Sequence, residues 1–355
     1  MSVFRRLYVI LICIFLGLLL FFSSSVTNTV RETLSLCFSS VIPSLFPFLA
    51  VTKLFLGLRL ADTLPPSLKK IMKPIFSVSE NSFPALIFGL IGGYPVGATI
   101  CASLYKDRLI CRKEAERTLA FCNNAGPAFI LSTVGIGMFS SLRIGTLLLL
   151  IHISSAVITG LLFKIFAPID AHTTKLPQKN SPLSFSFAFT DSIYGAMVSS
   201  LTISAYIVFF SVVTGIITMS FPFFASSPTL RAFFCGVLEI TSASYEIVQT
   251  TDIKTSFILI SALLGWGGLC VHFQTLSFLS GTDIKISEYF TGKLSQSLIS
   301  ALLAFFISKL SFFEEVTVFA DSKNYHHSSI NILLITILLL IFYLFFKKGW
   351  KKTSA

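Results

Sequence analysis

The chain has 355 residues, of which 54% are hydrophobic and only 12% are charged, and its mean hydropathy is +0.84. A water-soluble core of this length carries about twice that share of charge, so the composition excludes a soluble globular protein. Several apolar stretches reach the roughly 20 residues that a helix needs to cross a bilayer. The net charge of +11 comes from Lys and Arg in short loops and at the ends. That distribution is typical of cytoplasmic retention and gives no reason to expect nucleic acid as a partner.

Six of the seven cysteines lie within apolar segments, and none has Cys-x-x-Cys spacing. We interpret them as small packing side chains rather than metal ligands. The sequence predicts no metal and no cofactor.

The first apolar run covers residues 7–22 and follows two arginines. Because Ser-Ser-Ser-Val after it is a poor cleavage site, we expect an uncleaved first span with its N-terminus in the cytoplasm. The second apolar segment, 29–58, contains Pro43 and Pro47, which predict a kinked span.

Residues 83–105 have a glycine-rich centre, Gly92-Gly-Tyr-Pro-Val-Gly-Ala98, and a cluster of Lys and Arg on either side. A crossing would place one of these clusters outside, against the positive-inside rule. A re-entrant hairpin with its tip at 92–97 keeps both clusters in the cytoplasm, and glycine and proline supply the turn. The hairpin is therefore our prediction, and a spanning helix is the alternative.

Residues 118–138 begin and end like a membrane helix but are interrupted at Asn123, Asn124, Gly126 and Pro127. We predict a half-helix up to Asn123, an unwound stretch, and a new half-helix from Pro127, since proline is well tolerated at a helix start. Unwound backbone at membrane depth survives only where it is buried in protein or lines a wet cavity. This pattern is typical of a transporter site, whereas a kinked structural helix is the simpler alternative.

The remaining apolar segments continue the alternation of spans. They are 144–166 with His152, 192–219, the hairpin-sized 230–248, the span 253–279 that is broken at 265–274, 294–312 and 330–346. We expect His152 to be a packing residue. A non-basic loop after residue 312 suits the outside, and the lysines after residue 346 suit the cytoplasm.

Together these elements predict an all-α polytopic membrane protein, with about eight transmembrane helices and two re-entrant hairpins in an inverted repeat. The order span, hairpin, broken span, span occurs twice, with an odd number of crossings between equivalent points. The predicted divisions are a first anchor at 1–28, repeat 1 at 29–166, a cytoplasmic linker at 167–190, repeat 2 at 191–312, and an outside loop, last helix and basic tail at 313–355.

We expect the two hairpin tips and the two broken spans to meet near the membrane midplane. Helix N-termini after Pro95, Pro127 and Gly268 would favour an anion there. The central parts of these four elements carry no Arg or Lys, so amides, hydroxyls and helix dipoles would hold it. The candidate substrate-binding residues are Gly93, Tyr94, Pro95, Asn123, Asn124, Gly126, Thr241, Ser242, Trp266, Gly268, His272 and Gln274.

Glu239 is an acidic residue inside an apolar segment, which makes it a candidate for a coupling cation or a proton. The alternative is that Glu239 caps the half-helix that follows it. His272 either titrates together with Glu239 or serves as a structural hydrogen-bonding group. Trp266 either stacks on an aromatic solute or lines a helix contact.

Four motifs carry a resemblance to a known family. They are Ile42-Pro-Ser-Leu-Phe-Pro-Phe48, Gly92-Gly-Tyr-Pro-Val-Gly-Ala98, the run from Glu114 to Ile130 with Asn-Asn-Ala-Gly-Pro, and Gly265-Trp-Gly-Gly-Leu-Cys-Val-His-Phe-Gln274. Over about residues 30–310 the chain resembles the sporulation integral membrane protein YlbJ (SpoV-type) family. That family belongs to the nucleoside-recognition or Gate domain group, which looks related to concentrative nucleoside transporters.

The resemblance implies a protein of endospore-forming bacteria, located in the membrane around the forespore or in the cell membrane. It also implies the movement of dipicolinic acid from mother cell to forespore. Dipicolinate is a small, planar, aromatic dianion, which suits converging helix N-termini and a stacking tryptophan.

Our leading hypothesis is a membrane transporter of a small organic anion, dipicolinate by resemblance, with the solute and the lipid bilayer as its partners. The alternatives are a nucleoside carrier and a non-transporting protein of spore envelope assembly. An enzyme is not expected, because the membrane segments hold no Ser-His or paired-Asp constellation. The sequence leaves a homo-oligomer open.

Overall fold

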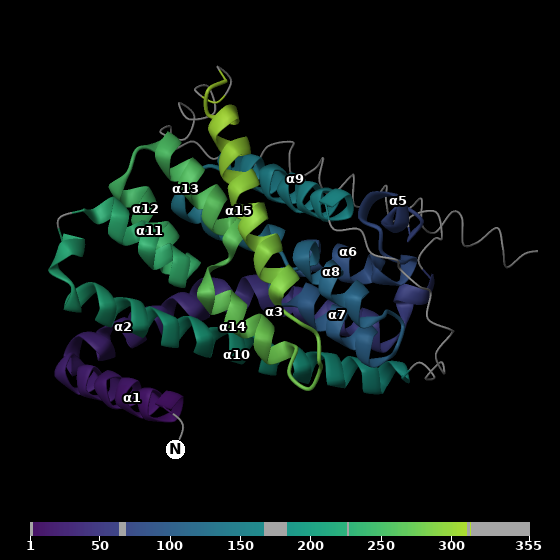
Figure 1. Cartoon of the computed structure of the whole chain (residues 1–355), viewed down its shortest axis with the longest axis horizontal. Coiled ribbons are helices and arrows are strands. Elements are labelled where there is room, and N and C mark those ends of the chain that lie inside the picture. Colours follow the sequence, from purple (N-terminus) through teal and green to yellow (C-terminus); the bar gives the residue numbers. More distant parts are fainter. Residues whose placement is uncertain (1–2, 64–68, 167–182, 226, 311–312, 314–355) are drawn as a thin grey trace, which may run out of the picture.

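The computed structural model describes residues 3–63, 69–166, 183–225, 227–310 and 313, and these residues form helices and turns without a strand (Figure 1). Five helical stretches of this part are long and apolar enough to cross a membrane. They are Ser23–Gly57, Leu142–Phe166, Phe185–Ser220, Ile253–Phe278 and Ser287–Ile307. This agrees with the predicted polytopic membrane protein. The count of eight spans stays a prediction, and the last predicted span, 330–346, lies outside the described residues.

The N-terminal part consists of α1 (Val3–Phe21) and a long helical rod built from α2 (Ser23–Leu36), the π-helical η1 (Cys37–Val41) and α3 (Ile42–Gly57). The π-helical turn η1 lies just before Pro43 in this span. Turns of this kind are a usual cause of helix kinks, and η1 is therefore the place for the kink that the prolines predict. Along α1 many apolar side chains are exposed, as suits contact with lipid.

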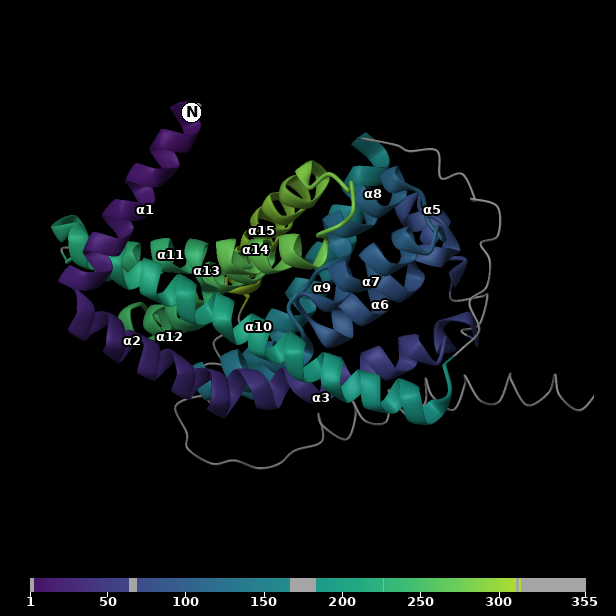
Figure 2. The same cartoon turned by 90° about the horizontal axis from the view of Figure 1, so that it is seen from below.

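The rod packs along α10 (Phe185–Ser220), which runs beside it for most of its length (Figure 2). Val41 and Leu49 of the rod are buried in the same apolar cluster as Ala196, Ile203 and Ile207 of α10. The helix α10 begins at Phe185, so it includes residues 185–190, which were assigned to the linker 167–190 from the sequence.

Two helical hairpins occur where the sequence predicts them. The first consists of α6 (Phe83–Gly92) and α7 (Val96–Lys106), and the second of α11 (Pro228–Leu238) and α12 (Ile240–Thr250). Each arm has 10 or 11 residues. At 1.5 Å per residue an arm extends about 15 Å, half the apolar thickness of a bilayer. Re-entry from one membrane face stays a prediction.

Two glycines bring the first hairpin into contact with the backbone of α8 (Arg112–Cys122). A Cβ atom would lie 1.8 Å from the Cys122 carbonyl oxygen if built on Gly89, and 2.2 Å if built on Gly97. Only glycine allows such an approach, so α6, α7 and the end of α8 form one tightly packed unit.

Both predicted breaks are present. The helix α8 ends at Cys122, residues 123–126 have no regular secondary structure, and a helical turn begins at Pro127 and continues as the π-helical η4 (Phe129–Met138). In the second broken helix, Gly267 with φ of +92° separates α13 (Ile253–Trp266) from α14 (Gly268–Phe278).

Two further helices complete the bundle, α9 (Leu142–Phe166) and α15 (Ser287–Ile307). The helix α15 packs against α13, α9 and α8, so it joins the second half of the bundle to the first (Figure 1). The helix α15 starts at Ser287, seven residues before residue 294, where the sequence predicts the span to begin. Short helical turns join the larger elements, namely η2 (Leu60–Thr63), α5 (Met72–Phe76), η3 (Glu80–Ser82) and η5 (Pro222–Ala225).

The order helix, helical hairpin, broken helix, helix thus occurs twice, once from α2 to α9 and once from α10 to α15. That the two copies are inverted relative to a membrane remains a prediction. The order nevertheless brings both hairpin tips and both breaks into the interior.

Candidate functional site

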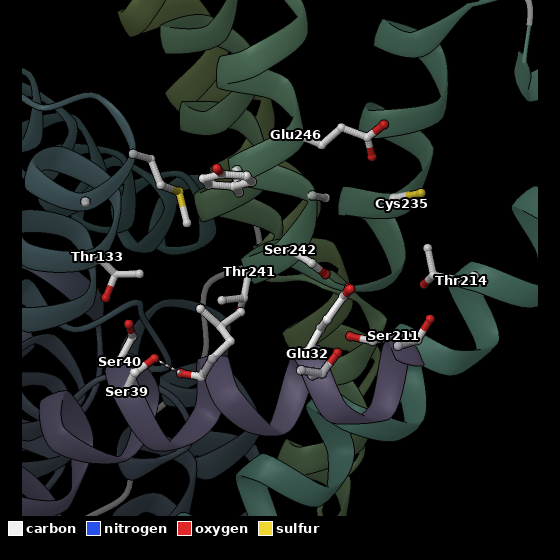
Figure 3. Close-up of a pocket in the computed structure, with 18 of the residues that line it drawn as sticks. Glu32, Ser39, Ser40, Thr133, Ser211, Thr214, Cys235, Thr241, Ser242 and Glu246 are labelled. Carbon is white, nitrogen blue, oxygen red and sulfur yellow. Dashed lines mark hydrogen bonds between the residues drawn. The ribbon is translucent and has the colours of Figure 1, made fainter. Parts of the chain in front are cut away.

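A cavity of about 920 Å³ lies between the rod α2–η1–α3, η4, α10 and the hairpin α11–α12 (Figure 3). Its size lies within the range of sites for small organic molecules. Hydroxyl groups dominate the polar part of its wall. They belong to Thr29, Thr33, Ser39, Ser40, Ser44, Ser132, Thr133, Ser211, Thr214, Thr218, Thr241 and Ser242.

Three charged side chains also line this cavity, Glu32, Arg231 and Glu246. The guanidinium of Arg231 donates to Glu246 Oε1, with Nε 2.7 Å from it. The Arg231 side chain is 40% exposed and lines the cavity. Figure 3 shows Glu32 on the rod and Glu246 on α12, on opposite sides of the space. The sequence analysis missed Arg231 because it considered only the centre of the hairpin, and Arg231 lies in the first turn.

A second, much smaller cavity of about 50 Å³ marks the place where the hairpin tips and the breaks meet. Five predicted residues line this tip junction: Tyr94, Gly126, Glu239, Thr241 and Gln274. Its volume suits a water molecule or two and is too small for an organic anion. Thr241 lines both cavities, so the second hairpin tip separates the large cavity from the tip junction.

The side chain of Glu239 caps α12, the alternative that the sequence left open. Its two carboxylate oxygens accept from the backbone amides of Thr241 at 2.6 Å and Ser242 at 2.9 Å, and from the Ser242 hydroxyl. A carboxylate at this position also interacts favourably with the helix dipole. Consequently the first amides of α12 are already occupied, and an external anion has no access to them in this conformation.

Asn123 and Asn124 are fully buried and line neither cavity. Asn123 Nδ2 donates to Thr275 Oγ1 at 2.9 Å, and Asn124 Nδ2 donates to the Phe121 carbonyl at 2.8 Å. Asn124 Oδ1 accepts from Gln296 Nε2 at 2.9 Å. The two amides therefore stabilise the break by tying it to α14, α15 and the end of α8.

The predicted ring residues also make structural contacts. Trp266 Nε1 donates to the Val237 carbonyl at 3.1 Å, and its ring meets the His272 ring edge-on with centroids 4.3 Å apart. His272 Nδ1 is 2.9 Å from the Tyr289 hydroxyl. In this conformation Trp266 thus lines a helix contact. His152 on α9 is a buried packing residue, as expected, and its Nε2 accepts from the Ala125 amide at 3.0 Å.

Of the three remaining predicted residues, Gly93 and Gly268 hold backbone segments together and Pro95 does not. A Cβ on Gly93 would lie 2.7 Å from the Gly126 amide nitrogen, so the first tip rests directly on the first break. A Cβ on Gly268 would lie 3.1 Å from the Leu238 carbonyl, so α14 starts directly beneath the second tip. Pro95 faces a separate small cavity between α7, α3 and α10. The first tip is also fixed to α13, because the Tyr94 hydroxyl donates to the Leu264 carbonyl at 2.6 Å.

Lys293 on α15 is the buried charge that the sequence analysis did not identify. Its side chain is fully buried, and Nζ donates to the Asn123 carbonyl at 2.9 Å and to Gln296 Oε1 at 2.6 Å. Nζ also lies 5.3 Å from the centre of the Tyr94 ring. A lysine inside a membrane helix costs up to about 2.5–3.5 kcal/mol on insertion scales, which makes Lys293 a candidate functional residue. The sequence contains a pattern that points to Lys293, since Tyr289, Lys293 and Gln296 have the spacing of one helical face.

A second polar cluster joins α7 and α8 to the loop before α15. Arg112 bridges Glu116 and Asp283, and the Tyr105 hydroxyl donates to Asp283 Oδ1 at 2.6 Å. The hydrogen bond from Tyr105 and the nearby Arg112 guanidinium lower the pKa of the Asp283 carboxyl. The buried Arg117 pairs with Glu288 at 3.0 Å in the same region. Within the described part of the chain, no group of His, Cys, Asp and Glu is arranged to hold a metal ion.

The chain is similar to the sporulation integral membrane protein YlbJ of Bacillus subtilis (strain 168). The two are 27% identical over 338 residues, which cover 85% of this chain and 81% of the relative. This similarity supports the predicted resemblance to the YlbJ family. No family model matches the chain and no solved structure matches it, so the wider Gate group remains a resemblance.

Proposed function

We propose that this relative of the sporulation integral membrane protein YlbJ is a multi-pass carrier of a small organic anion, and that the anion is dipicolinate. The observation that carries the proposal is the hydroxyl-lined cavity of about 920 Å³, bounded by a helical hairpin whose tip also lines the junction of the broken helices. Broken helices and hairpins around a central site are the usual parts of secondary carriers. The choice of dipicolinate follows the family resemblance.

The chemistry of the cavity supports an anionic substrate of this size. Arg231 can bind a carboxylate through two parallel hydrogen bonds. In this conformation its guanidinium pairs with Glu246, and both of its donating nitrogens contact the same oxygen, Oε1. We propose that one substrate carboxylate replaces Glu246 as the partner of Arg231. The surrounding hydroxyls, among them Thr133, can donate to the second carboxylate.

Movement of the second hairpin is the proposed transport step. Since Thr241 separates the large cavity from the tip junction, displacement of α11–α12 would connect the two spaces. Glu239 would move with the hairpin and is our proposed coupling group, with a proton as the coupled ion. The proposed location is the membrane around the forespore or the cell membrane, with both termini in the cytoplasm.

The test is uptake of radiolabelled dipicolinate into vesicles that contain the purified protein. Wild type should show saturable uptake that uridine does not inhibit. Arg231→Gln and Thr133→Val should each raise the KM about tenfold, because each removes a hydrogen-bonding group worth about 1–1.5 kcal/mol from the cavity. Thr202→Val is the matched control, since Thr202 lies on α10, is only partly buried and is not among the cavity-lining residues.

Three outcomes contradict this proposal in different ways. Competition by uridine would favour a nucleoside carrier that uses the same cavity. Absence of uptake of either solute by folded protein would favour the role in spore envelope assembly. Equal KM values for wild type and the two cavity variants would move the binding site away from this cavity.

A further inference from the structure

The oxygen atoms around Lys293 Nζ are of the kind that binds cations in broken-helix carriers. The Asn123 carbonyl belongs to the C-terminal end of α8, where the helix dipole is negative and no further helical amide follows. Gln296 Oε1 is the second oxygen. In such carriers, freed carbonyls and half-helix C-terminal ends coordinate Na⁺. Here an ammonium group of the chain itself occupies that position.

A further buried oxygen belongs to Asn123, although no hydrogen bond joins it to Nζ. Asn123 Oδ1 has no hydrogen-bond partner although Asn123 is completely buried. The neighbouring side chains that face Lys293 are aromatic or neutral polar, with the Tyr94 ring from the first tip and Gln296 from α15. Among the described residues no carboxylate forms an ion pair with Lys293. The positive charge is therefore balanced by oxygen dipoles, as a bound metal cation would be.

We infer that Lys293 is a tethered cation that fills the cation site of the first break, so that the carrier needs no Na⁺. This inference rests on the proposed carrier function for its transport consequence, although the site itself does not. The ammonium joins the break, the first hairpin tip and α15, which are the elements that a bound Na⁺ would otherwise hold together. It supplies permanently the cross-link that a cotransported ion supplies only while it is bound.

The site is tested by thermal unfolding of the full-length protein in detergent, in sodium-free buffer. Lys293→Ala removes the ammonium and leaves its oxygen partners in place. Its Tm should fall, and NaCl or ethylammonium chloride should raise it again by several degrees more than choline chloride, whose cation is too large. Lys285→Ala is the matched control, because Lys285 is exposed just before α15. The wild type and this control should respond equally to all three salts.

If Lys293→Ala does not fold, ethylammonium added during purification should recover folded protein where choline does not. Lys293→Met provides an independent measurement, because it fills the same space without a charge. It should have a lower Tm than wild type and show no recovery with any salt. A Lys293→Ala protein that does not respond specifically to a small cation, or a Lys293→Met protein as stable as wild type, would overturn the assignment.

The transport consequence has its own readout. Replacing Na⁺ by N-methylglucamine on both sides of the vesicle membrane should leave wild-type dipicolinate uptake unchanged. A several-fold fall would overturn the inference while leaving the carrier intact. Absence of uptake in both media would overturn the carrier, whereas the thermal measurement would still decide whether Lys293 fills a cation site.

Discussion

Replacing Glu239 by Gln should destabilise the protein, because the carboxylate offers two acceptor oxygens and the amide offers one. In the structure, Oε1 accepts from the Thr241 amide and Oε2 accepts from the Ser242 amide and hydroxyl. The NH₂ group of glutamine would face one of these amides donor to donor. Glu239 is only 2% exposed, so bulk water does not replace the lost acceptor.

The expected magnitude follows from these contacts. A buried donor left without an acceptor costs about 1–3 kcal/mol. Loss of the negative charge at the start of α12 costs roughly another 0.3–1 kcal/mol. The sum of about 1.5–4 kcal/mol corresponds to a fall in Tm of about 3–8 °C, at about 2 °C per kcal/mol for a chain of this size.

The assay is thermal unfolding in detergent followed by tryptophan fluorescence. Glu80→Gln is the matched control, since Glu80 is exposed and caps no helix by its side chain. Its Tm should stay within a degree of wild type. If Glu239→Gln unfolds at the wild-type temperature, the reasoning fails, and Glu239 then holds a proton or has another partner in the native protein.

Two further substitutions test the packing and the polar cluster. Gly97→Ala places a methyl group 2.2 Å from the Cys122 carbonyl oxygen, about 1 Å inside normal contact, and overpacking of this kind costs about 1–3 kcal/mol. Its Tm should fall clearly below that of Gly17→Ala, whose new methyl group meets nothing within 4 Å; equal values would contradict the close contact. Asp283→Asn should lower Tm slightly at pH 7, because the folded state lowers the pKa of this carboxyl, chiefly through the hydrogen bond from Tyr105. A lowered pKa stabilises the fold above the ordinary value of about 3.9 and ceases to do so as the pH falls below it. The difference from wild type should therefore shrink between pH 5 and pH 3, and a difference that grows toward acid would contradict the assignment.

The sequence predicted the interruptions of the helices well, because these depend on local backbone chemistry. Pro127 begins a new helical turn as expected, and both hairpins turn at the predicted places. Glycine and proline act through the conformations available to a single residue, and these effects need no knowledge of the neighbouring helices. The same local reasoning left two roles open for Glu239, and the structure shows the cap.

The location of the site could not be predicted as well, because it depends on how distant helices pack. The large cavity takes part of its wall from the rod and from α10, which appeared in the sequence as ordinary spans. Asn123 and Asn124 were expected to face a solute, whereas the structure uses their amides to join helices. Lys293 was overlooked for a different reason. The predicted span began at residue 294, directly after Lys293, whereas the helix begins at Ser287 and includes this lysine among its buried residues.

The glycine contacts of the first hairpin have a mechanical consequence. Gly89 and Gly97 touch the backbone of α8, and neither partner has a rotatable side chain at the contact. A displacement of α6 or α7 along α8 would have to separate main chain from main chain. The corresponding glycine of the second hairpin, Gly236, meets only the flexible end of the Leu263 side chain. The arms of the two hairpins therefore differ at these glycines: the first has main chain against main chain, and the second has main chain against a side chain that can change rotamer.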